Sequence, residues 1–339
     1  MITIEDIKRA QDLVGDQLIK TPCTYSTTLS DHTNCKVYLK LENLQLTGAY
    51  KVRGALNRLM NLSEEEKAKG VIASSAGNHA QGVALAAKKL GISATIVMPE
   101  TTPLSKIQGT KKFGANVVLH GNFYDEAYQK AQEIQKKNGH VFIHPFNDTD
   151  IIAGQGTIGL EIFEALPDLD VVVVPIGGGG LISGVSVALK TLNPNIRIIG
   201  VEADQMAAMK ASIDAKEIVE VAKEKTIADG IAVTTVKENT FEIVSRYVDE
   251  IVTVSEAEMA QSIMMLLEVE KILVEGAGSA AFAALSHGKI SNVDGKKVGV
   301  IISGGNIDVN FLSRVIERGL SEDGRLTTLV IMVPDTPGI

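Results

Sequence analysis

The sequence has few cysteines, no long apolar run and no excess of positive charge. Cys23 and Cys35 are its only cysteines, so it has neither a disulfide framework nor a Cys-x-x-Cys pair. No apolar run approaches the roughly 18 residues that a membrane-spanning helix needs. Lysine and arginine total 33 against 41 aspartates and glutamates, a net charge of −8, which disfavours binding to nucleic acid or anionic lipid. We therefore expect a cytoplasmic protein with no nucleic acid and no membrane as partners.

The composition is that of a folded globular chain. Of the 339 residues, 45% are hydrophobic and 22% are charged, and this length predicts about two domains. The first fifteen residues have the pattern of an amphipathic helix, with Thr3 and Asp6 as a capping pair at its start. They do not have the basic start and apolar core of a secretory signal.

Four glycines mark a repeating unit in the first half of the chain. Each follows a helical pattern and precedes a short apolar run: Gly70, Gly91, Gly114 and Gly139. Glycine just past a helix forms its left-handed C-terminal cap, and strands alternating with helices at this spacing predict a parallel sheet covered by helices. We expect residues 48–145 to form a small domain, with strands at Val71–Ser74, Ala94–Met98, Asn116–Leu119 and Val141–Ile143.

A second group of predicted strands ends in polar or glycine-rich turns. Val171–Val174 is a continuous β-branched run, as expected for a strand buried on both faces. Arg197–Val201 ends at Glu202, and Lys297–Ile302 ends in Ser-Gly-Gly-Asn. Open α/β sheets bind ligands at the carboxyl ends of their strands. The predicted fold class is therefore α/β with two open, twisted parallel-sheet domains, the larger formed by residues 1–47 and 146–320.

Four consecutive glycines after Pro175 are the strongest signal for a binding site. Gly177–Gly180 allow the backbone to approach a ligand with several N–H groups, and the helix that starts near Leu181 adds its positive end. The site therefore favours an anion, most simply a phosphate, and we expect a side chain at Gly179 to face it. The alternative is a tight strand-to-helix turn without a ligand.

Two common phosphate motifs do not fit these glycines. A P-loop needs Gly-x-x-x-x-Gly-Lys-Ser/Thr, and no lysine stands at the required place. The dinucleotide pattern Gly-x-Gly-x-x-Gly fails at Ile182 when counted from Gly177 and at Ser183 when counted from Gly178. Glu202 nevertheless stands at the end of the next strand, where an acid binds the ribose of NAD. An NAD-dependent oxidoreductase therefore remains an alternative.

Two further segments carry groups suited to chemistry. Lys51 stands between glycines and next to Tyr50, although most lysines are simply solvated. Ser75, Asn78 and His79 lie between a strand and a helix, where exposed N–H groups and short polar side chains suit a carboxylate. The alternative is that Ser75 or Asn78 only caps the helix.

Three other patterns do not support a catalytic or metal site. Ser186 lies within a predicted helix and not at the strand-to-helix turn that a nucleophile elbow requires. His140 and His144 flank a strand, so they do not share a helical face as metal ligands would. Cys23 and Cys35 are most simply buried thiols.

Four motifs in this order resemble the fold-type II pyridoxal-phosphate enzymes. They are Ala-Tyr-Lys-Val-Arg-Gly-Ala, Ser-Ala-Gly-Asn-His-Ala-Gln-Gly, Gly-Gly-Gly-Gly-Leu-Ile-Ser-Gly and Ser-Gly-Gly-Asn, and the resemblance covers residues 5–320. The pattern is most similar to the threonine dehydratase (threonine ammonia-lyase) family. The resemblance implies a fold like that of tryptophan synthase β and pyridoxal 5′-phosphate as cofactor. It implies no metal, because the partner of Glu202 in the divalent site of some relatives is Ala208 here.

The resemblance assigns roles to individual residues. Lys51 matches the lysine that binds the cofactor covalently and, once free, acts as the base; Tyr50 stands beside it where the family often has phenylalanine. Asn78 matches the residue that hydrogen-bonds the pyridine 3-oxygen, and Ser303 matches the partner of the pyridine nitrogen. The phosphate is expected at Gly177, Gly178, Gly179, Gly180 and Leu181, and the substrate carboxylate at Ser75, Gly77, Asn78 and His79.

These roles imply β-elimination of water from a hydroxy amino acid, followed by a hydrolysis that takes up water again and releases ammonia. The expected reaction converts L-threonine to 2-oxobutanoate and ammonia, with L-serine to pyruvate as a secondary activity. Serine racemase is an alternative with the same fold and cofactor, but the serine that acts opposite the lysine in those relatives is replaced here by Ala76. A silent amino-acid-binding regulator is a further alternative, against which the presence of Lys51 argues.

The family also implies features outside the catalytic site. A homo-oligomer, either a dimer or a tetramer, is expected. The segment Arg325–Ile339 contains a predicted strand, Leu326–Val333, followed by a turn, and resembles the first strand of a truncated ACT domain. Because ACT domains bind amino acids as regulators, this segment implies allosteric control, as in isoleucine biosynthesis.

Overall fold

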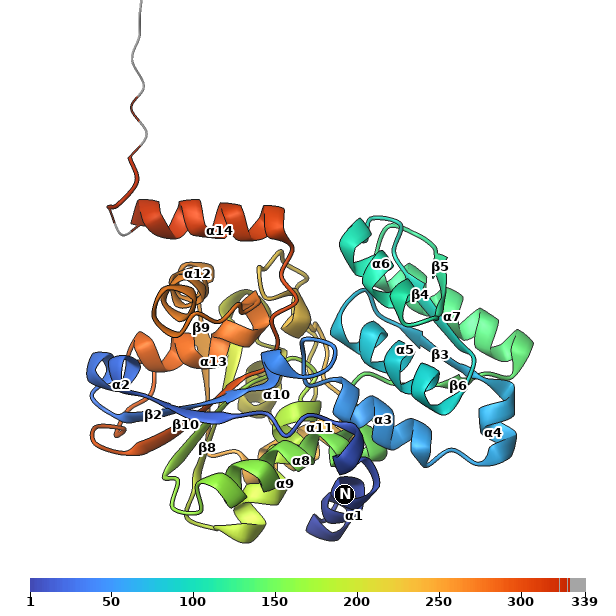
Figure 1. The fold of residues 1–339 in the computed structure, drawn as a ribbon, viewed down its shortest axis with the longest axis horizontal. Helices are drawn as coiled ribbons and strands as arrows, with labels where there is room; N and C mark the ends of the chain where they lie inside the picture. Colours follow the sequence, from blue (N-terminus) through green and yellow to red (C-terminus); the bar gives the residue numbers. More distant parts are fainter. Residues whose placement is uncertain (323, 328, 330–339) are drawn as a thin grey trace, which may run out of the picture.

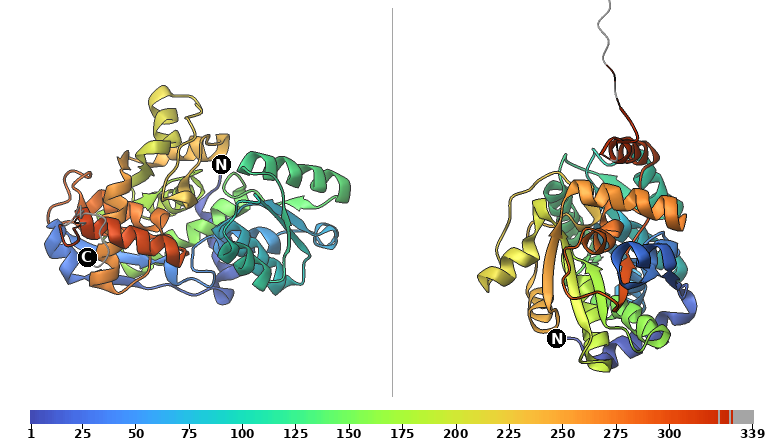
Figure 2. Two further views of the ribbon diagram at one scale, coloured as in Figure 1. Left: turned by 90° about the horizontal axis from the view of Figure 1, so that it is seen from above. Right: turned by 90° about the vertical axis from the view of Figure 1, so that its left-hand side faces the viewer.

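The computed structural model describes residues 1–322, 324–327 and 329, which form two lobes (Figure 1). In these residues, the larger lobe is built on a six-stranded sheet and the smaller lobe on a four-stranded sheet. Figure 2 shows the smaller lobe at one end of the molecule, beside the larger. Most of the expected ACT-like segment, residues 325–339, lies outside the described residues.

The strands of the larger sheet lie in the order β1-β2-β10-β7-β8-β9. Val298 in the central strand pairs in parallel with Val37 on one side and Val171 on the other. Within the described sheet only the edge strand β1 is antiparallel, because residues 27–35, which connect it to β2, are fewer than the dozen or so that a parallel crossover needs. The strand bounds are β1 Cys23–Ser26, β2 Lys36–Leu41, β7 Val171–Pro175, β8 Arg197–Ala203, β9 Glu250–Val254 and β10 Lys297–Ile302. The predicted fold class is confirmed, with a mixed pairing at this one edge.

The smaller sheet is parallel throughout, in the order β5-β4-β3-β6. Its strands are β3 Val71–Ser74, β4 Ala94–Met98, β5 Asn116–Leu119 and β6 Val141–Phe142. These match the predicted strands, except that the last ends one residue earlier. The four glycines that predicted the repeating unit all have positive φ. Gly91 and Gly139 are left-handed C-terminal caps as predicted, whereas Gly70 has φ 76 and ψ 174 and lies outside the left-handed helical region.

Helices cover both sheets, and the first helix begins at the capping pair that the sequence predicts. Thr3 with Asp6, and Ser63 with Glu66, form reciprocal capping boxes. The helices of the larger lobe are α1 Ile4–Val14, α2 Thr27–Thr33, α8 Thr149–Ala165, α9 Gly180–Leu192, α10 Ala208–Ala215, α11 Glu238–Tyr247, α12 Glu256–Met265, α13 Gly276–Ser286 and α14 Val309–Glu322. Those of the smaller lobe are α4 Glu64–Lys69, α5 Asn78–Leu90, α6 Leu104–Lys112 and α7 Tyr124–Asn138.

The core of the larger lobe lies on both faces of its sheet. Val173 of β7 belongs to one apolar cluster together with Phe282 of α13. Its neighbour Val174 belongs to a second cluster together with Leu181 of α9. Successive strand residues point to opposite faces, so a strand covered on both sides must be apolar at every position. This explains the uninterrupted β-branched run of β7.

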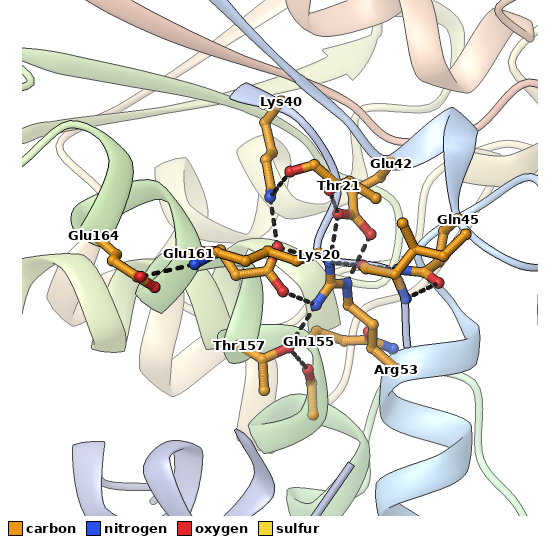
Figure 3. A network of polar contacts seen from close by, with 12 residues as sticks. Lys20, Thr21, Lys40, Glu42, Gln45, Arg53, Gln155, Thr157, Glu161 and Glu164 are labelled. Atoms are coloured by element: carbon orange, nitrogen blue, oxygen red, sulfur yellow. Dashed lines mark hydrogen bonds and ion pairs between the residues drawn. The ribbon is translucent and has the colours of Figure 1, made fainter. Parts of the chain in front are cut away.

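Helix α3 (Val52–Met60) packs against both α5 of the smaller lobe and α8 of the larger. Its residue Arg53 donates from Nε to Glu42 over 2.8 Å and from Nη1 to Glu161 of α8 over 2.6 Å (Figure 3). Lys40 of β2 also pairs with Glu161, over 2.5 Å. These four residues, here called the Arg53 cluster, expose at most 6% of their side chains. Two cations and two anions thus balance each other, as buried charges require.

Two smaller features complete the comparison with the sequence. Cys35 is buried as predicted, but Cys23 is only partly buried, because it stands on the edge strand β1. No helix among the described residues is long and apolar enough to cross a membrane.

Candidate active site

A cavity of about 720 Å³ lies where strands of both sheets reach their carboxyl ends. Ser74 ends β3, Pro175 ends β7, Ser303 follows β10, and all three line the cavity. Every residue that the resemblance assigned to cofactor or substrate also lines it: Tyr50, Lys51, Ser75, Gly77, Asn78, His79, Gly177, Gly178, Gly179, Gly180, Leu181 and Ser303. The fold therefore brings together segments that are more than a hundred residues apart in the chain.

Lys51 immediately precedes α3 and is one of the residues that line the cavity. Nζ donates to the carbonyl oxygen of Pro145 over 3.1 Å and lies 5.3 Å from the centre of the Tyr50 ring. Burial lowers the pKa of Lys51 to about 8, although the negative charge of Glu275 opposes the shift. Burial also raises the pKa of the Tyr50 hydroxyl. An amine with this pKa is partly neutral near physiological pH and can act as a nucleophile or a base.

Asn78 begins α5 and is held by two polar side chains from the larger lobe. Its Nδ2 donates to Glu275 Oε1 over 2.6 Å, and its Oδ1 accepts from Asn306 Nδ2 over 2.8 Å. Burial is the main cause that raises the pKa of Glu275 to about 7, with Asp229 adding to it and the Asn78 hydrogen bond opposing it. The amide of Asn78 is therefore oriented before any ligand binds.

The two histidines beside the cavity are neutral imidazoles. Burial, reinforced by the charge of Lys51, lowers the pKa of His79 to about 3. His79 Nε2 lies 2.9 Å from the carbonyl oxygen of Ile143, which can only accept, so Nε2 carries the hydrogen. His144 has a pKa lowered to about 4, mainly by burial, and its Nδ1 accepts from the main-chain N–H of Asn147 over 2.9 Å. Neither histidine supplies a positive charge to the site.

The glycine loop Gly177–Gly180 passes so close to its neighbours that side chains do not fit. A Cβ at Gly178 would overlap the ring of Phe146. Gly179 has φ +89, and a Cβ there would lie 2.6 Å from Cε of Met209, a residue that does not line the cavity. The expectation that a side chain at Gly179 would face the ligand is therefore wrong. What the loop presents to the cavity is main chain, including the N–H groups at the start of α9.

Glu202, which kept an NAD-dependent enzyme open as an alternative, has a different task. Both of its carboxylate oxygens accept main-chain hydrogen bonds from the start of α10, from Met209 over 2.9 Å and from Lys210 over 2.8 Å. It is buried, and this burial raises its pKa to about 7. Its oxygens are thus engaged in holding a helix end, and Glu202 is not among the residues that line the cavity.

Glu275 and Asn306 also line the cavity, although no sequence motif predicts a role for them. Asn306 belongs to the Ser-Gly-Gly-Asn motif, so its position was visible although only Ser303 received a role. Glu275 precedes α13 in the segment Val-Glu-Gly-Ala-Gly. From the sequence alone, it is not distinguishable from an ordinary glutamate at a helix start. Only the folded chain shows that it lies against Asn78, 197 positions earlier.

Two α/β lobes with a lysine, a glycine loop and a neutral serine around one cavity are the arrangement of fold-type II pyridoxal-phosphate enzymes. The chain belongs to the family of pyridoxal-phosphate-dependent enzymes, which it matches over residues 14–304. Pyridoxal phosphate is accordingly its cofactor, and an amino acid is the kind of substrate that fits the family.

Individual relatives agree with this assignment. The chain is 55% identical over 338 residues to an L-threonine ammonia-lyase of Thermotoga maritima, covering 100% of this chain and 84% of that protein. The solved structure of threonine deaminase isoform 2 from Solanum lycopersicum is similar with a TM-score of 0.88 and 39% identity, over 93% of this chain and 92% of that one. Maize serine racemase is similar with a TM-score of 0.88 and 35% identity, over 95% and 99% of the two chains.

Proposed function

We propose that this protein is a threonine ammonia-lyase, which converts L-threonine to 2-oxobutanoate and ammonia and acts on L-serine as a secondary substrate. One observation carries the proposal: Lys51, Asn78, the glycine loop and Ser303 line a single cavity. The chain that forms this cavity is 55% identical over its whole length to an L-threonine ammonia-lyase.

The residues present fit pyridoxal phosphate. Ser74 Oγ and His79 Nδ1 are buried polar atoms in cavity-lining residues, and neither has a hydrogen-bond partner among the described residues. In the proposal, the glycine loop and the Leu181 N–H bind the phosphate, Asn78 binds the ring oxygen and Ser303 the ring nitrogen. The Lys51 amine would bind the aldehyde carbon, with release of water. When bound, the cofactor supplies an electron sink for negative charge at the substrate Cα.

The protein's own groups then take the Cα proton and bind the substrate carboxylate. Lys51, freed by the substrate amine and with a pKa near 8, takes the Cα proton. The substrate carboxylate binds beside Ser75 and Gly77 at the start of α5, where Asn78 and His79 provide main-chain N–H groups. Ser303 is a buried neutral hydroxyl and does not keep a ring nitrogen protonated as an aspartate would. This weaker electron withdrawal favours prompt loss of the β-hydroxyl over transamination.

We also propose a cytoplasmic homo-oligomer. The net charge of −8 fits a soluble protein that does not bind polyanions. Leu44, Leu46 and Leu273 expose 48%, 40% and 40% of their surface, which supports contact with a second copy. Measurement of the protein's mass in solution tests whether it is a homo-oligomer. Allosteric control and a role in isoleucine biosynthesis stay predictions from the terminal segment.

The experiment that tests the function uses one purified sample. Its visible spectrum is recorded before and after addition of L-threonine, while ammonia and 2-oxobutanoate are measured. A cofactor band that changes with threonine, together with equal amounts of both products, supports the proposal. Protein that holds the cofactor and binds threonine without releasing ammonia would indicate a silent regulator instead.

The stereochemistry of the reaction separates this function from serine racemisation. Racemisation needs an acid–base group on the face opposite Lys51, and the matching residue Ala76 lines the cavity with a methyl group. The neighbouring Ser75 Oγ is engaged by the Gly77 N–H over 3.2 Å. We therefore expect L-serine to give pyruvate without D-serine, as measured by chiral chromatography. Ala76→Ser should introduce exchange of the Cα proton with solvent. D-serine formed by the wild type as fast as pyruvate would contradict the assignment.

The glycine loop gives a further prediction. Gly179→Ala places a Cβ at φ +89 and 2.6 Å from Met209 Cε, so the loop must shift. We expect the Kd for pyridoxal phosphate to rise by roughly 10-fold or more, because the shifted loop loses N–H contacts to the phosphate. Gly295→Ala is the matched control: it has φ +70 and nothing within 4 Å. It should lose stability by a similar strain but keep its cofactor affinity. Equal affinities of the two variants would place the phosphate elsewhere.

A further inference from the structure

A chain of hydrogen bonds between cavity-lining residues joins the Lys51 segment to Glu275. Asn306 Nδ2 donates to the carbonyl oxygen of Thr47 over 2.7 Å and to Asn78 Oδ1 over 2.8 Å. Asn78 Nδ2 donates in turn to Glu275 Oε1 over 2.6 Å. These residues come from four separate parts of the chain, so the bonds join the Lys51 segment, the start of α5, the start of α13 and the segment after β10.

The direction of the hydrogen bonds in this chain is fixed from its Thr47 end. The Thr47 carbonyl can only accept, so the atom of Asn306 that faces it must be the amide nitrogen. That nitrogen has two hydrogens, and the second makes the neighbouring atom of Asn78 an acceptor, its Oδ1. The nitrogen of Asn78 then faces Glu275, whose Oε1 accepts. The described residues provide an acceptor for one of the two Nδ2 hydrogens of Asn78, which leaves the other for a group in the cavity.

Asn306 is also held tightly against the segment that carries Lys51. Gly48 has φ +71, and a Cβ there would lie 2.5 Å from Asn306 Oδ1. The main chains of the two segments are joined as well, by Gly305 N–H to Gly48 O over 2.9 Å and by Tyr50 N–H to Ser303 O over 3.2 Å. Movement of Asn306 would therefore disturb both Lys51 and Asn78.

We propose that Asn306 and Glu275 are positioning residues. They hold the Asn78 amide as a hydrogen-bond donor toward the cofactor's ring oxygen and keep it in a fixed position relative to Lys51. The inference rests on the proposed binding of that oxygen by Asn78. A ring oxygen that carries negative charge needs a donor, and a flipped amide would present an acceptor and repel it. The chain from Thr47 to Glu275 excludes the flipped state.

The test uses the cofactor-loaded Asn306→Asp variant, which has the same shape but cannot donate to Thr47 or Asn78. We expect a shift in the absorption and circular dichroism of the bound cofactor. We also expect kcat for L-threonine to fall by roughly 10- to 100-fold, with a much smaller change in KM, because a misplaced donor affects the reacting state most. Asn306→Ala removes the donor without adding charge and decides the outcome if the aspartate variant does not fold. Glu275→Gln, which keeps an acceptor oxygen, should lose less than Glu275→Ala.

Asn43→Asp is the matched control. Asn43 Nδ2 also donates to a main-chain carbonyl, that of Leu273 over 3.1 Å, but Asn43 does not line the cavity. Its variant should keep the spectrum and kcat of the wild type. A folded Asn306 variant with unchanged cofactor spectrum and unchanged kcat would overturn the inference. The spectrum also separates the two proposals, because a wild type that holds the cofactor without acting on threonine would refute the function and leave this test intact.

Discussion

Lys51→Ala is expected to lose at least ~10³-fold in the rate of ammonia release from L-threonine. The substitution removes both the covalent attachment of the cofactor and the base that takes the Cα proton. The Lys51 amine is suited to both tasks because burial lowers its pKa to about 8. The measurement is kcat with saturating pyridoxal phosphate, so that weaker cofactor binding does not account for the loss.

Lys106→Ala is the matched control for this prediction. Lys106 also lines the cavity, but its amine is paired with the carboxylate of Asp229, another cavity-lining residue. Its loss should change kcat by less than roughly 10-fold, since the group neither binds the cofactor nor takes a proton. Near-normal ammonia release from Lys51→Ala, or equal losses in both variants, would contradict the role of Lys51.

The sequence was sufficient to predict the parts of the fold that depend on local patterns. The glycine-capped βα units placed the strands of the smaller sheet to within one residue, because apolar runs and helix ends are local signals. The direction of β1 was not predictable from such signals, since it depends on the length of a connection and on which edge is left open. Cys23 is partly exposed for the same reason.

The residues of the candidate site also fall into those that local motifs predict and those that depend on the folded chain. Lys51, the glycine loop and Ser303 each belong to a short motif that can be recognised in the sequence, and the fold places the three motifs around one cavity. Glu275 and the direction of a side chain at Gly179 depend on neighbours distant in sequence, Asn78 in one case and Met209 in the other. The ribose role considered for Glu202 failed for a more local reason: the turn after β8 brings the N–H groups of Met209 and Lys210, at the start of α10, onto its carboxylate.

The Arg53 cluster supports the largest prediction for stability. Arg53→Met is expected to lower the free energy of unfolding of the cofactor-free protein by about 3–5 kcal/mol, measured by urea denaturation. The reason is that Lys40 alone then faces two buried carboxylates, Glu42 and Glu161, so one negative charge is left without compensation. Lys20→Met is the matched control. Lys20 pairs with Glu164 over 2.7 Å in the same region, but the side chains are 62% and 68% exposed (Figure 3). Its loss should cost no more than about 1 kcal/mol.

A double variant tests whether the uncompensated charge, and not lost packing, causes the effect. In Arg53→Met, a second change of Glu42→Gln leaves Lys40 and Glu161 as a neutral pair, 2.5 Å apart. The glutamine can still accept the hydroxyl hydrogen of Thr21, which bonds Glu42 in the wild type. The double variant should therefore be more stable than Arg53→Met alone, even though it carries one more substitution. If the second change lowers stability further, the carboxylate of Glu42 does not carry the penalty, and the loss in Arg53→Met comes from the packing of the side chain between α3 and α8.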